Sequence, residues 1–99
     1  MLTDQQLAII KTKLAPFDPI FLGLFGSYAR NEEREDSDLD LLVEFGKKIN
    51  LLELISLEQQ LEEALGIKVD LVTKRALSKH IKGTVEKEVI TIMNRPYEV

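Results

Sequence analysis

The stretch LFGSYARNEEREDSDLDLLVEF, residues 24–45, contains two apolar runs joined by a polar and strongly acidic segment. Gly26 and Ser27 end the first run, and Asp38 and Asp40 lie at the start of the second. Carboxylates at the edge of an apolar core are costly unless a partner compensates their charge. This stretch therefore predicts two core strands and a place beside them where a charged partner binds.

The second apolar run has the alternation of a β-strand. Between residues 39 and 45, every second position is apolar. These positions share one face of a strand, so Asp38 and Asp40 point together toward the other face. The first run, residues 20–25, is apolar throughout, which predicts a strand that is covered on both faces and ends at Gly26.

Helical patterns precede and follow these two strands. Thr3 opens a capping-box pattern before an apolar periodicity that ends at Pro16. Asn50, three residues before Glu53, predicts the start of a second helix, and Gly66 predicts its end. The expected apolar stripe of this second helix consists of Leu51, Leu54, Leu57, Leu61 and Leu65.

The other segments complete an alternating order of helices and strands. Residues 27–34 predict a short helix followed by a loop, and residues 68–73 predict a third strand around Asp70. A last helix up to Pro96 is expected from the spacing of Ile81, Val85, Val89 and Ile92. The order predicts an α/β (α+β) fold, a three-stranded mixed sheet with flanking helices, in one domain over residues 1–99.

Composition excludes several classes of function. Ninety-nine residues with 44% hydrophobic content suffice for one modest core and leave little room for a separate substrate domain. A net charge of -4 predicts no direct binding of nucleic acid. An anionic substrate would therefore need a local anion-binding motif or a bound cation. The absence of cysteine excludes disulfides and thiolate chemistry. No apolar stretch is long enough to span a bilayer, so we expect a cytoplasmic protein.

Three features point to phosphate and metal chemistry. Gly26 and Ser27, between a strand and an expected helix, could cradle a phosphate, or they could form an ordinary capping turn. Asp38 and Asp40 offer hard oxygen ligands for Mg²⁺ or Mn²⁺, unless they belong to a solvated turn. Asp70 either joins their face or sits hydrated at a strand edge. Three converging carboxylates would have raised pKa values until a divalent cation binds.

Other polar residues give weaker signals. His80, the only histidine, is more typical of a surface or capping residue than of a catalytic base. Arg30 could approach a phosphate or pair with an acidic residue in the segment 33–36. Tyr28 could pack over a nucleotide base or cover its own helix. The basic pair that follows the third strand, at residues 74–75, could meet an anion or remain solvated.

Taken together, these motifs resemble the nucleotidyltransferase superfamily that includes DNA polymerase beta, most closely its minimal nucleotidyltransferase (MNT) branch. The family pattern is Gly-Ser-x-Ala-Arg-Gly, a short spacer, Ser-Asp-x-Asp-Leu and a later strand aspartate. Here it stands as GSYARN at residues 26–31, SDLDL at residues 37–41 and Asp70. Asn31 replaces the usual glycine, and asparagine tolerates the left-handed backbone that such a turn needs.

The resemblance implies a reaction and the residues that perform it. Nucleotide monophosphate is transferred from ATP by a mechanism in which two Mg²⁺ ions are expected. The implied catalytic and metal-binding residues are Asp38, Asp40 and Asp70. The implied nucleotide-binding residues are Gly26, Ser27, Arg30 and Ser37.

Small members of this family are similar to antitoxins whose partner is a helical HEPN-domain ribonuclease toxin. The resemblance implies transfer of AMP to a tyrosine of that toxin. Two other functions stay open. One is a non-enzymatic antitoxin that acts by complex formation, and the other is nucleotidyl transfer to a small molecule such as an aminoglycoside.

Overall fold

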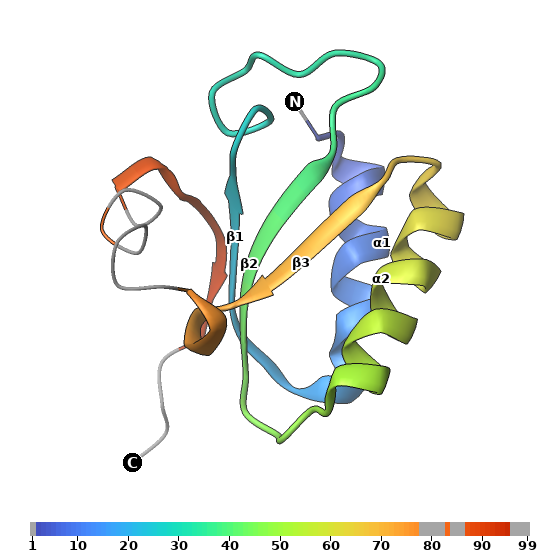
Figure 1. Ribbon diagram of the computed structural model, residues 1–99, viewed down its shortest axis with the longest axis vertical. Helices are drawn as coiled ribbons and strands as arrows, with labels where there is room; N and C mark the ends of the chain where they lie inside the picture. The colour runs from blue at the N-terminus through green and yellow to red at the C-terminus, as the bar shows by residue number, and fades with distance from the viewer. Residues whose placement is uncertain (1, 78–82, 84–86, 96–99) are drawn as a thin grey trace.

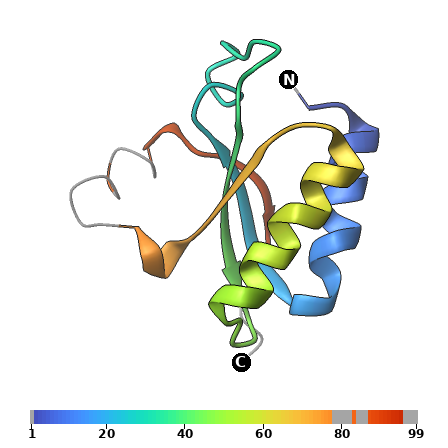
Figure 2. The same cartoon turned by 45° about the vertical axis from the view of Figure 1, so that its right-hand side comes forward.

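The computed structural model describes residues 2–77, 83 and 87–95, which form a mixed sheet with two long helices on one face (Figures 1 and 2). The helices are α1 (Asp4–Leu14) and α2 (Leu51–Leu65), and short 3-10 turns follow at η1 (Ala15–Phe17) and η2 (Lys74–Ala76). The strands are β1 (Pro19–Phe25), β2 (Leu39–Phe45), β3 (Val69–Thr73) and β4 (Ile90–Asn94). Their order is β3-β2-β1-β4, with β2 and β3 parallel and β1 antiparallel to both of its neighbours.

Both long helices begin where the sequence predicted. The Thr3 side chain accepts the N–H of Gln6 in a complete capping box, and Asn50 and Glu53 form a second one at α2. Gly66 ends α2 with a left-handed backbone at φ 69°. These boundaries depend on side chains within a few residues of each other, so the local sequence suffices to specify them.

The core lies between the helices and one face of the sheet. Its fully buried side chains include Ile10 of α1, Leu41 of β2 and Leu61 of α2. Leu51, predicted as part of the apolar stripe of α2, is instead 70% exposed, because core contacts of this helix begin one turn later, at Leu54. In the part of the chain that the structure describes, no helix is long and apolar enough to cross a membrane.

The prediction of a short helix over residues 27–34 is wrong, because this segment makes a single turn and then continues as a loop. The N–H of Arg30 donates to the carbonyl of Gly26, and the N–H of Glu32 donates to the carbonyl of Ser27. Asn31 lies between them at φ 58°, so it closes the turn in the left-handed conformation that asparagine tolerates.

The C-terminal segment forms a fourth strand where the sequence predicted only a helix. Residues 83, 87 and 88 are helical, but 90–94 pair with β1 as strand β4. β-branched side chains at positions 90–92 favour a strand, and β1 has a second edge that needs a partner. The sheet in the described residues therefore has four strands and not three. His80, Ile81 and Val85 lie outside the described residues.

Candidate active site

Carboxylates lie side by side where the parallel strands β2 and β3 begin. Asp40 and Asp70 are partners in the strand register. The residues that flank each of them belong to the core under the helices, so both aspartates lie on the opposite face of the sheet. Asp40 is half-buried, whereas Asp70 and Asp38, which directly precedes β2, are exposed. Asp70 therefore joins the face of Asp40, and it is also exposed on the edge strand β3, so both features that the sequence left open are present.

Negative charge is concentrated around Asp40. Its burial raises the pKa of this carboxyl above the ordinary value of 3.8, and the carboxylates of Asp70 and then Asp38 raise it further. Arg30 opposes these effects as the weakest of the four influences. The pKa of Asp40 is therefore raised in the expected direction, with burial as the largest cause and the neighbouring carboxylates as smaller ones.

The turn after β1 is in contact with the same carboxylate. Phe25, the last residue of β1, is the register partner of Asp40, and Gly26 follows at φ 74°. A Cβ atom at Gly26 would lie 2.2 Å from Oδ2 of Asp40. Only glycine combines this backbone conformation with so close an approach. The turn of the signature and the strand carboxylates are therefore parts of one site.

The signature turn also offers backbone donors. Among the described residues, the N–H groups of residues 27–29 have no hydrogen-bond acceptor, while those of residues 30–32 close the turn. Such free N–H groups beside a glycine suit the oxygen atoms of a phosphate. Gly26 and Ser27 thus lie in a single turn with free backbone donors, without the short helix that the sequence predicted to follow them.

Arg30 and Ser37, the other predicted nucleotide ligands, have partners within the chain. Nε of Arg30 lies 3.1 Å from Glu32, and Nη1 lies 3.5 Å from Glu88, so its partners fall outside the predicted segment 33–36. The hydroxyl of Ser37 accepts the N–H of Arg34 at 2.8 Å, which stabilises the loop before β2. That hydroxyl keeps its own proton available for a ligand.

Tyr28 and Lys74 lie in different parts of the fold. Tyr28 packs against the core, and burial, followed by the charge of Glu33, raises the pKa of its phenol. Lys74 is 3.6 Å from Glu44 and lies over the ring of Phe21, 3.8 Å from its centre. Tyr28 therefore covers the core, and Lys74 belongs to the far end of the sheet.

The donor set fits magnesium in chemistry and charge. Asp38, Asp40 and Asp70 supply carboxylate oxygens, which are the ligands that Mg²⁺ prefers. Within residues 2–77, 83 and 87–95, no group of three His, Cys, Asp or Glu side chains is spaced so that it could hold a metal ion. A bound cation would draw these three side chains closer together than they stand.

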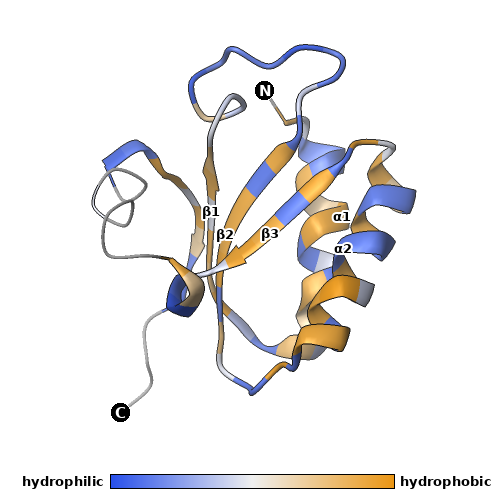
Figure 3. Cartoon of the chain, in the orientation of Figure 1, coloured by the Kyte–Doolittle hydropathy of each residue, from blue (hydrophilic) through white to orange (hydrophobic). Residues whose placement is uncertain are grey.

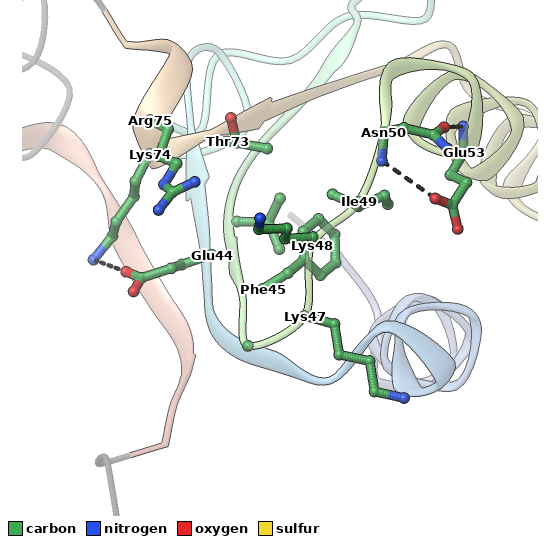
Figure 4. Close-up of a pocket in the computed structure, with 12 residues that line it drawn as sticks. Glu44, Phe45, Lys47, Lys48, Ile49, Asn50, Glu53, Thr73, Lys74 and Arg75 are labelled. Carbon is green, nitrogen blue, oxygen red and sulfur yellow. Dashed lines mark hydrogen bonds and ion pairs between the residues drawn. The ribbon is translucent and has the colours of Figure 1, made fainter.

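The structure also shows a pocket that the sequence did not predict. It measures about 900 Å³ and lies where β2 and β3 end, beside the loop that leads into α2 (Figure 4). Of its cationic residues, the sequence singled out only Lys74 and Arg75. The pair Lys47 and Lys48, directly before a helix in an acidic chain, was the signal that could have revealed it.

Comparisons with known proteins agree on one family. The family model described as polymerase beta, nucleotidyltransferase matches residues 8–98. Protein adenylyltransferase MntA of Thermococcus cleftensis is 49% identical over 71 residues, which cover 72% of each chain. A structure assigned to a minimal nucleotidyltransferase has a TM-score of 0.76 at 38% identity, over 87% of this chain and 88% of that chain. A chain in the crystal structure of a toxin-antitoxin with AMP-PNP has a TM-score of 0.80 at 26% identity, over 89% of this chain and 73% of that chain.

Proposed function

This chain belongs to the polymerase beta nucleotidyltransferase family, in its minimal nucleotidyltransferase branch, and on that premise we propose that it transfers AMP from ATP to a tyrosine of a partner protein. The contact between Gly26 and Asp40, beside Asp70, carries the proposal. It joins a turn with free backbone donors to the most concentrated negative charge of the sheet. A nucleoside triphosphate with its magnesium is complementary to both parts.

In the proposed reaction, the tyrosine hydroxyl oxygen bonds to the α-phosphorus of ATP. The bond from that phosphorus to the oxygen that bridges to the β-phosphate breaks, pyrophosphate leaves, and the hydroxyl proton passes to solvent. Magnesium, proposed as two ions on Asp38, Asp40 and Asp70, supplies charge neutralisation at the phosphoryl group and lowers the pKa of the hydroxyl.

The other signature residues bind and orient the triphosphate in this proposal. Free N–H groups of the turn at Gly26 and Ser27 donate to phosphate oxygens. Arg30, already held by Glu32 and Glu88 at the edge of the site, adds a positive charge. Ser37 donates its hydroxyl hydrogen from the loop before β2.

We assign the partner protein to the HEPN-domain toxins, so that AMP transfer neutralises the toxin. The support is the signature itself, the identity to a protein adenylyltransferase, and the likeness to a chain of a toxin-antitoxin structure with AMP-PNP.

The test is AMP transfer from ATP labelled at the α-phosphate, with Mg²⁺ and a HEPN-domain toxin as the acceptor protein. We expect the label on that protein with the wild type and with Asp36→Asn, a matched control in the exposed acidic loop. The double variant Asp38→Asn, Asp40→Asn should transfer none. Label at the wild-type rate from the double variant would refute the site. Loss of the toxin's ribonuclease activity without any label would instead show an antitoxin that acts by binding alone.

A further inference from the structure

The end of the sheet opposite the carboxylates carries a local excess of positive charge. Cationic side chains in the pocket lining are Lys47, Lys48, Lys74 and Arg75, and its carboxylates are Glu44 and Glu53. Lys74 is paired with Glu44, and Glu53 accepts the N–H of Asn50 at 3.2 Å. Lys48 and Arg75 are exposed and form no ion pair within the described ranges, and Lys47 points away from them (Figure 4). The whole chain has a net charge of -4, so this local excess of positive charge runs against its overall composition.

An exposed apolar patch adjoins the pocket. Leu51, Leu52 and Ile55, at the start of α2, are 70%, 78% and 41% exposed. Figure 3 shows the same end of α2 as hydrophobic. Asn50 and Glu53, which line the pocket, flank the two leucines along the chain, so the patch begins at the same end of α2 as the pocket. One exposed leucine is ordinary, but adjacent ones at a helix end indicate an interaction surface.

We propose that this docking surface, Lys48, Arg75, Leu51, Leu52 and Ile55, binds the acceptor protein through a segment that presents carboxylates beside apolar side chains. The inference rests on the proposed function, because it takes the partner of the transfer reaction as the occupant. Charge complementarity with the two exposed cations selects and orients the partner, and the apolar patch adds the buried area that ionic contacts alone lack.

The pocket side of the docking surface lies along the same strand as the active site, so an acceptor bound there can extend a tyrosine toward it. Glu44, in the pocket lining, lies on the same face of β2 as Asp40. The two are four residues apart, which corresponds to about 13 Å at a rise of about 3.3 Å per residue. One protein interface of ordinary size covers that distance. Affinity and turnover therefore depend on different residues of this chain.

A second copy of this chain fits the docking surface less well. Its most acidic segment, residues 32–36, complements the cations but contains no apolar residue. Association through that segment would leave Leu51 and Leu52 uncovered. An acceptor with both kinds of side chain satisfies both halves of the surface.

The experiment measures binding of the HEPN-domain protein by calorimetry, together with the kinetics of AMP transfer. One variant reverses charge, Lys48→Glu with Arg75→Glu, and another removes the apolar patch, Leu51→Gln with Leu52→Gln. Lys11→Glu with Lys13→Glu on α1 is a control of equal charge change, also at exposed positions. We expect each docking variant to raise Kd and KM at least tenfold and to leave kcat within twofold, while the control leaves all three within twofold.

Salt sharpens the same experiment. Raising the ionic strength from about 0.1 M to about 1 M shortens the Debye length from about 10 Å to about 3 Å. Wild-type binding should weaken with salt, and that dependence should be smaller in the charge-reversal variant.

Three results would overturn the docking surface. Unchanged Kd in both variants is the first. The second is that the wild type binds phosphatidylserine vesicles and the docking variants do not, although they still bind the HEPN-domain protein. The third is that the wild type self-associates in sedimentation and the docking variants do not, although they still bind the HEPN-domain protein. If the wild type binds but transfers no AMP, the proposed function fails, and variant-sensitive Kd values still support the docking surface.

Discussion

The two ends of the β2–β3 strand pair differ in charge, burial and tolerance of change. At the start of the strands, half-buried Asp40 has Asp70 beside it in the register and the backbone of Gly26 against its carboxylate. At the other end, Lys48 and Arg75 are exposed and have no ion-pair partner in the described part of the chain. This difference teaches that one end can be specialised for chemistry and the other for affinity, since desolvated, crowded charges act strongly and solvated charges act weakly.

Asp70→Asn should cause the largest difference between the effect on turnover and the effect on partner affinity. Loss of one preorganised electrostatic group costs about 100-fold to 1,000-fold in turnover. We expect a loss of that size in kcat for AMP transfer, with Kd for the partner protein within twofold of the wild type. Glu63→Gln, at an exposed position of α2, is the control and should change neither quantity. Equal losses of kcat and affinity in Asp70→Asn would show that turnover and partner binding depend on the same residues.

Gly26→Ala tests the contact that joins turn and carboxylate. A left-handed alanine costs about 1–2 kcal/mol, and its Cβ would also collide with Oδ2 of Asp40, 2.2 Å away. Gly66→Ala is a matched control, because Gly66 has a similar φ of 69° and no atom within 4 Å of the place that an added methyl group would take. Urea unfolding should show destabilisation in both variants. Transfer should fall at least tenfold more in Gly26→Ala, and equal activity in the two would show that the contact with Asp40 is unimportant.

Glu58→Ala should destabilise strand β3 next to Asp70. The Glu58 carboxylate of α2 accepts the N–H of Leu71 at 2.8 Å, next to Asp70 on the outer edge of β3. Losing this acceptor for a part-buried N–H should lower the free energy of unfolding by about 1 kcal/mol. Glu58→Gln keeps an acceptor oxygen and should lose less. Urea unfolding of the three proteins checks this order, and identical stabilities would mean that water replaces the carboxylate.

The smallest effect concerns the pH dependence of stability. Because the pKa of Asp40 is raised in the folded state, the folded state binds this proton more tightly than the unfolded chain, whose value is near 3.8. The associated stability is complete below that pH and is lost as pH rises through the folded-state pKa. Asp40→Asn removes this titration, so its stability relative to the wild type should improve as the pH rises above about 4. Urea midpoints over a series of pH values check it, and a difference in stability that does not change with pH would contradict it.

Elements that depend on neighbouring residues could be predicted from the sequence. The capping box at Asn50 and the alternation of β2 were recognisable because their determinants lie within four or five positions of each other. The left-handed turn at Asn31 was predictable for the same reason. The length of that turn was not, because a single turn and a short helix begin with the same pattern.

Only the tertiary structure decided which distant residues meet. Pairing of residues 90–94 with β1 depends on a free strand edge elsewhere in the chain, so periodicity alone favoured a helix there. Lys48 and Arg75 line the same pocket because β2 and β3 pair in parallel and end side by side. The sequence by itself determined the chemistry of Asp38, Asp40 and Asp70 as candidate ligands. Their neighbourhood, and the glycine turn pressed against Asp40, came from strand register, which is set by the packing of the whole core.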